Sequence, residues 1–355
     1  MRGKLIYTRL TQWEHWPTLV YYIPLSPFFI IRALKAGHLA HFIAANPGIL
    51  YSGVGTESKS ETLKLVPKEY RPEGILVLKS ESIDKKLECF NEKGFVYPII
   101  AKPDIGFRGY LVKKIDSEND LINYFNKVDE DIIIQEFIPY KKELGIFYYR
   151  MPGEKKGKIT SITDKKFITV IGDGKSTLSQ LINKDERAFL YLDLFKNIHK
   201  EKIDFIYKEG EEVTLSVIGN HSKGTQFLNG NHLISKELEY FMDQICNRIN
   251  GWYYGRLDIK YKNLEKLLLK EDFKILEVNG IISEPTHIYD ASHNNASFIN
   301  AVKTLNWHWE IMGEIAVINN KSYGIEYPKI LPLLKNLYWL RKHSKKLKKL
   351  NKTDF

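Results

Sequence analysis

Cysteine is almost absent from this chain. Only Cys89 and Cys246 occur among its 355 residues. Two isolated thiols form neither a disulfide framework nor a metal cluster, and they fit a reducing compartment. The first ten residues carry three cations and no long apolar run, which argues against a cleavable signal peptide. We therefore expect a cytoplasmic protein.

The sequence also lacks a long uninterrupted apolar run. In residues 17–31 the chain is almost wholly apolar, but Pro24 and Pro27 interrupt it. Arg32 and Lys35 then follow before the run reaches the roughly 20 residues that a membrane span needs. A transmembrane helix is not expected. We interpret the segment as buried core, with a shallow membrane contact as the alternative.

Outside the C-terminus the chain has little excess of positive over negative charge. The chain has 53 cations and 43 acids, a net charge of +10, and residues 335–355 hold eight of the cations and one acid. That difference of +7 is most of the net charge, so global basicity does not argue for nucleic-acid binding. The basic, aromatic end is predicted to be a helix or tail. It either keeps the chain soluble as a disordered end or makes a weak contact with anionic membrane at the inner face.

Repeats, low-complexity tracts and Gly/Ser linkers are lacking too. Apolar residues make up 43% of the chain, which is enough for a buried core. Residues 1–78 are rich in proline and aromatics, and strand-like and helix-like patterns alternate after them. This order predicts an α+β protein with mixed or antiparallel sheets. We expect an N-terminal unit over 1–78, a main domain over 79–315, and a basic C-terminal helix or tail over 316–355.

Several elements follow from local patterns. Runs rich in β-formers predict strands at residues 96–101, 110–115 and 132–134. Ser117 stands before an apolar periodic stretch and predicts a helix start. After Ser235 the apolar residues recur with i, i+3, i+4 spacing, which predicts an amphipathic helix.

The strongest chemical signal lies in two strands predicted over 254–261 and 272–279. Side chains alternate between the two faces of a strand. The polar residues that share one face are Arg256, Asp258 and Lys260 in the first strand, and Glu277 and Asn279 in the second. If the strands pair as a hairpin, the two acids and the asparagine converge beside the arginine. Such oxygen ligands suit Mg²⁺, and a guanidinium would stabilise a transferring phosphoryl group or an oxyanion. A solvated strand face with an ordinary Arg–Asp pair is the alternative.

Two glycine-containing loops are candidates for phosphate binding. In residues 102–109 the glycines let backbone N–H groups approach a phosphate, and Lys102 and Arg108 supply positive charge. A short hairpin is the alternative. Residues 170–177 fail the P-loop spacing, because Thr169 stands where the first glycine is required. A Walker-type NTPase is therefore excluded.

Residues 134–139, followed by Glu143, suit a strand between two domains that binds adenine. Backbone groups near Phe137 and Ile138 would pair with the base, and the Glu143 carboxylate would accept hydrogen bonds from ribose hydroxyls. Without its neighbours, the segment is only a strand that ends at a proline.

In this order the motifs resemble the ATP-grasp superfamily, especially D-alanine–D-alanine ligases and the ligase part of cyanophycin synthetase. The resemblance covers residues 59–295. It implies an α+β ATP-grasp fold whose two subdomains clasp ATP, with a hinge near 135–143, a small N-terminal unit and a basic C-terminal tail. It also implies two Mg²⁺ ions, with Mn²⁺ as an alternative. Asp258 and Glu277 would hold one ion, and Glu277 and Asn279 the other.

The same resemblance implies the remaining site residues. Arg256 would face the transition state, and either Lys165 or Lys166 would face phosphate. The nucleotide-binding positions would be Lys59, Lys102, Gly106, Arg108, Gly109, Gln135, Glu136, Phe137, Ile138 and Glu143. Gly106–Gly109 would be the mobile loop over the phosphates. Phe107-Arg108 stand where D-alanine ligases have a Ser-rich loop, so the resemblance does not extend to D-alanine as the substrate.

The activity that the resemblance implies is ATP-dependent carboxylate–amine ligation. The γ-phosphate would pass to a small carboxylate, and an amine would attack the acyl phosphate with loss of phosphate. Residues 283–290 and 219–224, with His287 and His221, are candidates for substrate contact. An ATP-grasp kinase of small molecules and a non-catalytic adaptor that holds ATP or a membrane are the alternatives. A homodimer is left open, and no nucleic-acid partner is expected.

Overall fold

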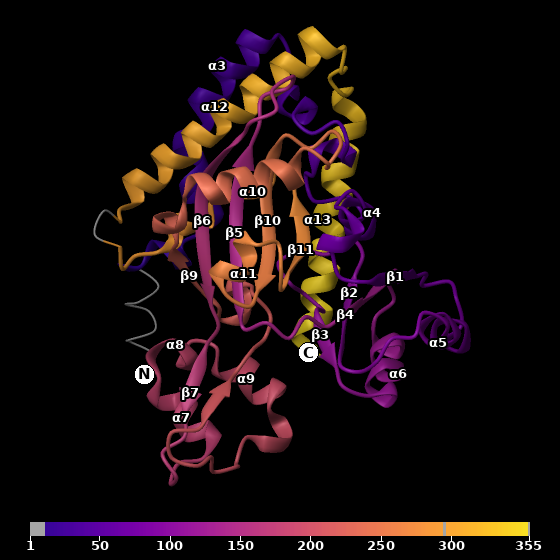
Figure 1. The fold of residues 1–355 in the computed structure, drawn as a ribbon, viewed down its shortest axis with the longest axis vertical. Coiled ribbons are helices and arrows are strands. Elements are labelled where there is room, and N and C mark those ends of the chain that lie inside the picture. The colour runs from indigo at the N-terminus through magenta and orange to yellow at the C-terminus, as the bar shows by residue number, and fades with distance from the viewer. Residues whose placement is uncertain (1–10, 294–295, 354–355) are drawn as a thin grey trace. The chain divides into compact units, whose positions relative to one another are not determined.

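The computed structural model describes residues 11–293 and 296–353, so the expectation about a signal peptide in residues 1–10 lies outside the described part. The described chain divides into two compact units (Figure 1). The first holds the residues up to Gly74 together with residues 138–164 and 228–343. The second holds residues 75–137, residues 165–227 and the chain from Ser344 onward. The three-part division drawn from the sequence stays a prediction.

A five-stranded sheet in the order β11-β10-β5-β6-β9 is the centre of the first unit. Its strands are β5 (Lys142–Tyr149), β6 (Lys158–Lys166), β9 (Gln226–Asn229), β10 (Tyr254–Tyr261) and β11 (Phe273–Asn279). The pairs β11–β10, β10–β5 and β5–β6 are antiparallel. Figure 1 shows the helices α10 (Lys236–Cys246) and α11 (Leu264–Leu268) over one face of this sheet. The apolar side of α10 packs there against alternate strand residues such as Ile146 and Leu257.

The opposite face of the sheet is covered at one end by α12 (Phe298–Tyr323). Phe147 of β5 and Tyr254 of β10 pack on this side against Ile311 and Ile315 of the helix. The other helical segments of the unit are η1 (Trp13–His15), α2 (Thr18–Tyr22), η2 (Ile23–Leu25), α3 (Ser26–Ala36), η3 (His41–Ala44), η4 (Leu50–Ser52), α4 (Lys59–Lys64), η5 (Lys68–Tyr70), η8 (Asn231–Leu233) and η9 (Thr286–Tyr289).

A buried asparagine joins the N-terminal segment to this sheet. The Asn46 side chain donates to the carbonyl of Tyr254 at 2.7 Å and accepts from the backbone N–H groups of Tyr253 and Tyr254 at 2.8 and 2.9 Å. Its backbone N–H donates to the Ser52 hydroxyl at 2.8 Å. Because a buried amide that lost these partners would destabilise the fold, the contact fixes the N-terminal segment beside the start of β10.

The second unit contains a four-stranded sheet in the order β1-β4-β2-β3. Its elements are β1 (Gly74–Val77), α5 (Ile83–Glu92), β2 (Ile99–Pro103), β3 (Lys113–Ile115), α6 (Glu118–Lys127) and β4 (Ile132–Glu136). A smaller part of the same unit contains β7 (Thr169–Ile171), α7 (Leu178–Lys184), α8 (Glu186–Phe189), α9 (Leu192–Ile198), η6 (Lys200–Lys202), β8 (Glu212–Thr214) and η7 (His221–Lys223). Each part has its own hydrophobic core.

The predicted class and most predicted elements are confirmed. The protein is α+β, and Ser117 and Ser235 cap α6 and α10 through their hydroxyls. The predicted strand over 110–115 is shorter than expected, because only its last three residues form β3. Its first half is a turn, in which Tyr110 N–H donates to the Phe107 carbonyl and Leu111 has a positive φ of 59°.

The C-terminal end is a helix, α13 (Ile330–Thr353), and the described part is therefore not a disordered tail. Leu333 packs beside η3 in the first unit, and Leu347 is fully buried in the core of the second. Asn351 accepts hydrogen bonds from the backbone N–H of Leu111 and from the Lys223 ammonium, both at 3.0 Å. The buried side of α13 thus has specific partners along its length.

The interpretation of residues 17–31 as buried core is wrong. The segment folds as α2, η2 and α3, and only Tyr21 and Leu25 of its large apolar residues are buried. These short helices have one face toward α12 and η9, so a sequence that is apolar on all sides leaves the side chains of the other face in solvent. By length and composition alone, Thr18–Ala36 could cross a membrane.

A buried histidine on α12 predicts that the fold loses stability in acid. His308 is 1% exposed and lies edge-on to Phe147, with ring centroids 4.5 Å apart. Among the described residues neither ring nitrogen has a hydrogen-bond partner. Burial, and secondarily His287, lowers the pKa of His308 to about 3. The neutral imidazole is therefore favoured in the folded state.

Because the folded-state pKa lies below the unfolded value, this contribution is complete above about pH 6.5 and is lost as the pH falls toward 3. We expect His308→Phe to remove about 2 kcal/mol of the stability difference between pH 7 and pH 5, measured by urea unfolding at both values. His232→Gln, at an exposed position, is the control and should leave the difference unchanged. An equal pH dependence in wild type and His308→Phe would contradict this account.

Candidate functional site

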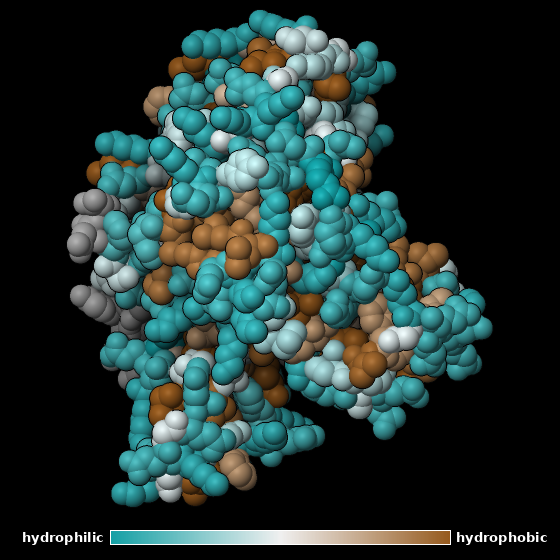
Figure 2. All heavy atoms as spheres, viewed as in Figure 1, coloured by the Kyte–Doolittle hydropathy of each residue, from teal (hydrophilic) through white to brown (hydrophobic). Residues whose placement is uncertain are grey.

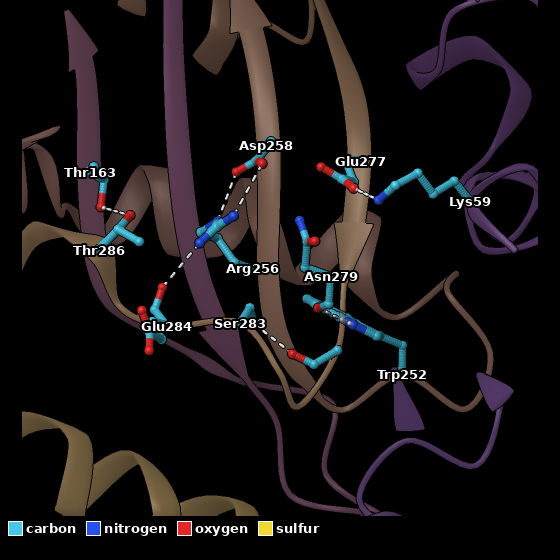
Figure 3. Close-up of polar contacts among 11 residues, drawn as sticks. Lys59, Thr163, Trp252, Arg256, Asp258, Glu277, Asn279, Ser283, Glu284 and Thr286 are labelled. Carbon is cyan, nitrogen blue, oxygen red and sulfur yellow. Dashed lines mark hydrogen bonds and ion pairs between the residues drawn. The ribbon is translucent and has the colours of Figure 1, made fainter. Parts of the chain in front are cut away.

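The two predicted metal strands form an antiparallel hairpin. In its register Asp258 lies opposite Glu277, and Arg256 lies opposite Asn279. Side chains directly opposite each other project to the same side of a sheet, with Cβ atoms about 5 Å apart. The intervening Leu257 is buried in the core beneath. The predicted convergence of the acids, the asparagine and the arginine is therefore present (Figure 3).

Backbone proximity at the end of the hairpin requires glycine. Gly255 has a φ of +150°, and a Cβ there would lie 1.9 Å from the carbonyl oxygen of Asn279. A Cβ on Gly280 would lie 2.0 Å from the carbonyl oxygen of Ser52. The N–H of Ile281 instead donates to that carbonyl at 3.0 Å. The glycines thus let the N-terminal loop approach the end of β11.

Each carboxylate at the site has its own cationic partner. Asp258 accepts from the Nε of Arg256 at 2.8 Å and from its Nη2 at 3.3 Å. Glu277 accepts from the ammonium of Lys59, which lies in the first turn of α4. The side chains of the first pair are 8% and 16% exposed, and those of the second are 28% and 25% exposed. The first pair is therefore the more sheltered of the two.

These carboxylates keep the two cations charged in spite of burial. Burial alone would lower the pKa of Arg256, but the charges of Asp258, Glu277 and Glu284 outweigh it, and the pKa is raised. Burial alone would likewise lower the pKa of Lys59, and Glu277 reverses that effect. The site is therefore a set of permanent, alternating charges on one face of a sheet.

Asn279 adds a polar group without a partner. Among the described residues, its side-chain Nδ2 is buried and has no hydrogen-bond partner. Its backbone carbonyl oxygen accepts from Trp252 Nε1 at 3.3 Å. Figure 3 shows this side chain on the same side of the hairpin as Arg256 and Glu277. A buried amide that lacks a partner suits a position where a ligand or ion completes the contacts.

A second carboxylate group lies in the loop that follows β11. The backbone carbonyl of Glu284 accepts from Arg256 Nη1 at 3.2 Å. Its side chain accepts from the hydroxyl of Tyr289 at 2.6 Å and from the hydroxyl of Tyr22 in α2. Beside it, the hydroxyls of Thr163 and Thr286 are 2.9 Å apart. Sequence reasoning placed the segment 283–290 near the substrate but did not find Tyr22 or Thr163.

His287, a candidate for substrate contact, is uncharged in this environment. Burial, followed by the effect of His293, lowers the pKa of His287 to about 4. The imidazole is therefore neutral near pH 7 and cannot bind a carboxylate by charge.

At the predicted adenine hinge, the boundary between the two units falls between Phe137 and Ile138. In the first unit, the Ile138 carbonyl accepts from Lys260 at 3.4 Å, and Glu143, 4% exposed, lies opposite Lys260 in the register of β5 and β10. In the second unit Gln135 is buried, and its Nε2 has no hydrogen-bond partner among the described residues. Glu136 next to it is exposed.

The predicted phosphate loop belongs to the second unit. Lys102 lies in β2, and Arg108 and Gly109 have positive φ values of 50° and 68°. The carbonyl of Arg108 accepts from the Ser222 hydroxyl at 2.8 Å. A Cβ on Gly109 would lie 3.3 Å from the side chain of Asn220. The loop therefore rests on the 220–224 turn in this conformation, and its predicted mobility stays a prediction.

The second glycine loop is a structural turn, as its failed P-loop spacing indicates. Asp173 accepts from the backbone N–H groups of Lys175 and Ser176 at 3.0 and 2.6 Å. These bonds, first that of Ser176, lower the pKa of Asp173. Thr177 then begins α7 with a reciprocal capping pair to Gln180. The N–H groups are therefore already used by the loop's own carboxylate.

Two lysines at the end of β6, Lys165 and Lys166, are the candidates for the lysine that faces phosphate. Lys165 is 4% exposed and Lys166 is exposed. By strand alternation Lys165 shares its face with Thr163, which points toward Thr286. Local geometry thus favours Lys165 of the two.

No protein-family model matches the chain, and no curated protein sequence matches it. Its structure is similar to solved ligases. A D-alanine–D-alanine ligase from Bacillus anthracis complexed with ATP is 14% identical, with a TM-score of 0.42, over 75% of this chain and 68% of that one. The VanG D-Ala:D-Ser ligase from Enterococcus faecalis is 13% identical, with a TM-score of 0.41, over 74% and 62%. A bifunctional glutathione synthetase from Pasteurella multocida is 16% identical, with a TM-score of 0.36, over 70% and 35%.

The chain thus spans about a third of the glutathione synthetase and less than two thirds of the D-Ala:D-Ser ligase. The resemblance seen in the sequence recurs in these similarities. At identities of 13–16% and TM-scores below 0.5, however, the activity has to be argued from the chain's own residues.

The sheltered ion pair predicts a measurable coupling. Replacing one member leaves the other charge partly buried and unpaired, so Asp258→Asn and Arg256→Met should each lower the free energy of unfolding by about 3 kcal/mol. The double variant should lose less than the sum, by at least about 1 kcal/mol, in urea titrations of all four proteins. Lys85→Met, which breaks an exposed i,i+3 pair with Glu88, should leave the midpoint unchanged. Additive losses would show that the two side chains are not coupled.

Proposed function

We propose that this protein is an ATP-dependent ligase that activates a small carboxylate as an acyl phosphate and joins it to an amine, with release of ADP and phosphate. The observation that carries this proposal is the face of the β10–β11 hairpin. Two carboxylates, an amide and one guanidinium lie there within one register of an antiparallel pair, and the Lys59 ammonium reaches Glu277 from α4. Alternating fixed charges of this kind can accept both a polyanion and its counter-ions.

The residues present fit Mg²⁺. Asp258 and Glu277 offer carboxylate oxygens, and Asn279 offers an amide whose nitrogen has no partner among the described residues. Turning that amide over would present its oxygen instead. Mg²⁺ keeps several waters and takes few protein ligands, so the donor set does not require a cluster of three acidic or histidine ligands. The described residues contain no such cluster.

When bound, Mg²⁺ would neutralise the crowded oxygens of the nucleotide's phosphates. Asp258, Glu277 and Asn279 would hold it. For Glu277 to do so, the Lys59 ammonium has to leave the carboxylate, and the phosphates of ATP are the anions to which it would turn. In this structure the Lys59 ammonium balances the negative charge of Glu277.

Arg256 is the residue we propose for the reacting group. Its guanidinium is fixed by the Asp258 carboxylate on one side and by the Glu284 carbonyl on another. A guanidinium held in this way needs no reorganisation as negative charge develops on a transferring phosphoryl group or a tetrahedral oxyanion.

Glu284 is the group we propose for the amine. Two phenol hydroxyls, from Tyr22 and Tyr289, hold its carboxylate, and its backbone carbonyl accepts from Arg256. A positioned carboxylate close to the reacting group would bind an ammonium group and orient it for attack. The neutral imidazole of His287 lies in the same segment and carries no charge that would repel that ammonium.

The first prediction concerns the acyl phosphate. With ATP, Mg²⁺, a panel of small carboxylates and hydroxylamine, we expect a hydroxamate, because hydroxylamine captures an acyl phosphate. Glu277→Gln should reduce hydroxamate formation by at least about a hundredfold, since it removes a ligand charge from the phosphate site. Glu69→Gln, at an exposed acid paired with Arg248, is the matched control and should retain activity.

ADP formation without hydroxamate, sensitive to Glu277→Gln, would instead indicate a kinase that phosphorylates a hydroxyl group. Turnover that survives Glu277→Gln would overturn the assignment of the site. Circular dichroism of Glu277→Gln should match wild type, and its urea titration should show a fully folded protein under the assay conditions, so that a loss of turnover is assigned to the chemistry.

A second prediction separates the two lysines of β6. Because Lys165 is buried on the face of Thr163 and Lys166 is exposed on the other face, Lys165→Met should raise the KM for ATP or lower kcat by at least about tenfold. Lys166→Met should change either constant less than about twofold. Equal effects, or a larger effect at Lys166, would contradict the alternation argument.

A further inference from the structure

An aliphatic stripe lies on the outside of α3 and of η2, the short helical turn before it. Its members are Ile23, Pro27, Ile30, Ile31 and Leu34, which recur with i, i+4, i+7, i+8, i+11 spacing. At 3.6 residues per turn they fall within an arc of about 100°. The exposed fractions are 66% for Ile23, 54% for Ile30 and 76% for Leu34. Figure 2 shows hydrophobic atoms at the surface around the helix that Figure 1 labels α3.

The opposite face of the helix is fixed in place. Leu25 and Ala33 are buried. Arg32 points inward, and its guanidinium donates to the side chain of Asn306 on α12 at 3.0 Å and to the Asn306 carbonyl at 3.3 Å. Rotation of α3 to bury the stripe would break these bonds. The helix therefore has its polar anchor inside and its aliphatic residues outside, the reverse of a helix on the surface of a soluble domain.

Charge within the segment that carries the stripe is of one sign. Between Glu14 and Glu57 the sequence contains no acidic residue. Lys35 is exposed at the end of α3. On the neighbouring α12, Glu310 lies 4.0 Å from the Arg32 guanidinium and is itself 66% exposed. This pattern favours a partner with an anionic surface and an apolar interior. It does not favour a protein groove that is uncharged or has an acidic rim.

The exposed side of α13 has the same character. His38, just after α3, stacks on Tyr327, just before α13, with ring centroids 5.2 Å apart. Within the first unit the exposed residues of α13 include Leu331, Leu334, Lys335, Tyr338 and Lys342. They lie at i, i+3, i+4, i+7 and i+11, and Ile330–Thr353 contains no acid. Aliphatic, aromatic and cationic residues on one face are typical of helices in a lipid headgroup region.

We propose that α2 and α3 lie in the plane of an anionic lipid bilayer, with the aliphatic stripe inserted and Lys35 and the outer face of α13 on the headgroups. The segment lies along the surface and does not cross it, because its inner face is bound to α12 and two prolines divide it. The proposal does not depend on the ligase activity.

The test is vesicle flotation of the full chain with phosphatidylcholine vesicles, with or without phosphatidylglycerol. Wild type should float with the anionic vesicles, and added salt should weaken the binding. Ile30→Asn/Leu34→Asn removes two inserted side chains and should lower vesicle affinity by at least about tenfold. Val96→Asn/Ile171→Asn is the matched control, because these aliphatics are 81% and 54% exposed in the second unit. It should bind like wild type.

Lys35→Glu should weaken binding to the anionic vesicles several-fold and leave any binding to phosphatidylcholine alone unchanged. The urea midpoint of the Ile30/Leu34 variant should match wild type, and so should its ATP turnover, since neither residue touches the candidate site. Flotation that is equal in this variant and wild type would overturn the proposal. A failure of wild type to float would overturn it as well. If light scattering then shows a dimer that the Ile30/Leu34 variant dissociates, the stripe is a contact between two copies of the chain.

Discussion

The candidate site depends on the register of one antiparallel pair of strands. Asp258 faces Glu277 across the pair only while Leu257 and Val278, between the polar residues, stay in the core below. A shift by one residue would turn the acids into that core and the apolar residues into solvent. The hydrophobic effect beneath the sheet therefore holds the charges above it in place. Gly255 and Gly280 let the neighbouring backbone come close enough to fix the end of the hairpin.

Charge balance is the second condition of this arrangement. Two partly buried carboxylates at neighbouring positions would repel each other without compensation. Arg256 and Lys59 supply it from different elements, and both keep their protons because the carboxylates outweigh the effect of burial. The arginine pair is more sheltered and is held by a further carbonyl, whereas the lysine reaches Glu277 with one long side chain. The two cations therefore differ in how readily they can release their partner.

The sequence predicted what is local and left open what is distant. The β10–β11 hairpin, the capped helices α6 and α10 and the α+β class follow from alternation and spacing within short windows. Lys59 and Glu277 are 218 residues apart, and Tyr22 and Glu284 are 262 apart, so no pattern along the chain joins them. The orientation of segment 17–31 does not follow from its sequence, because apolar residues on every side do not indicate which face is buried. The inward face was decided by Arg32 and Asn306, a contact of two distant residues.

That segment also connects the two proposals. From the inner side of α2, the Tyr22 hydroxyl donates to the carboxylate of Glu284, whose backbone carbonyl accepts from Arg256. A few residues later the outer side of α3 presents the aliphatic stripe. Because lipid would hold the stripe and α12 holds the inner face, α2 and α3 would be restrained on two sides. Binding at a bilayer would then reduce the freedom of Tyr22, and less ordering entropy would remain to be lost when an amine binds at Glu284. The coupling needs no change of shape, since it acts through the rigidity of one short segment.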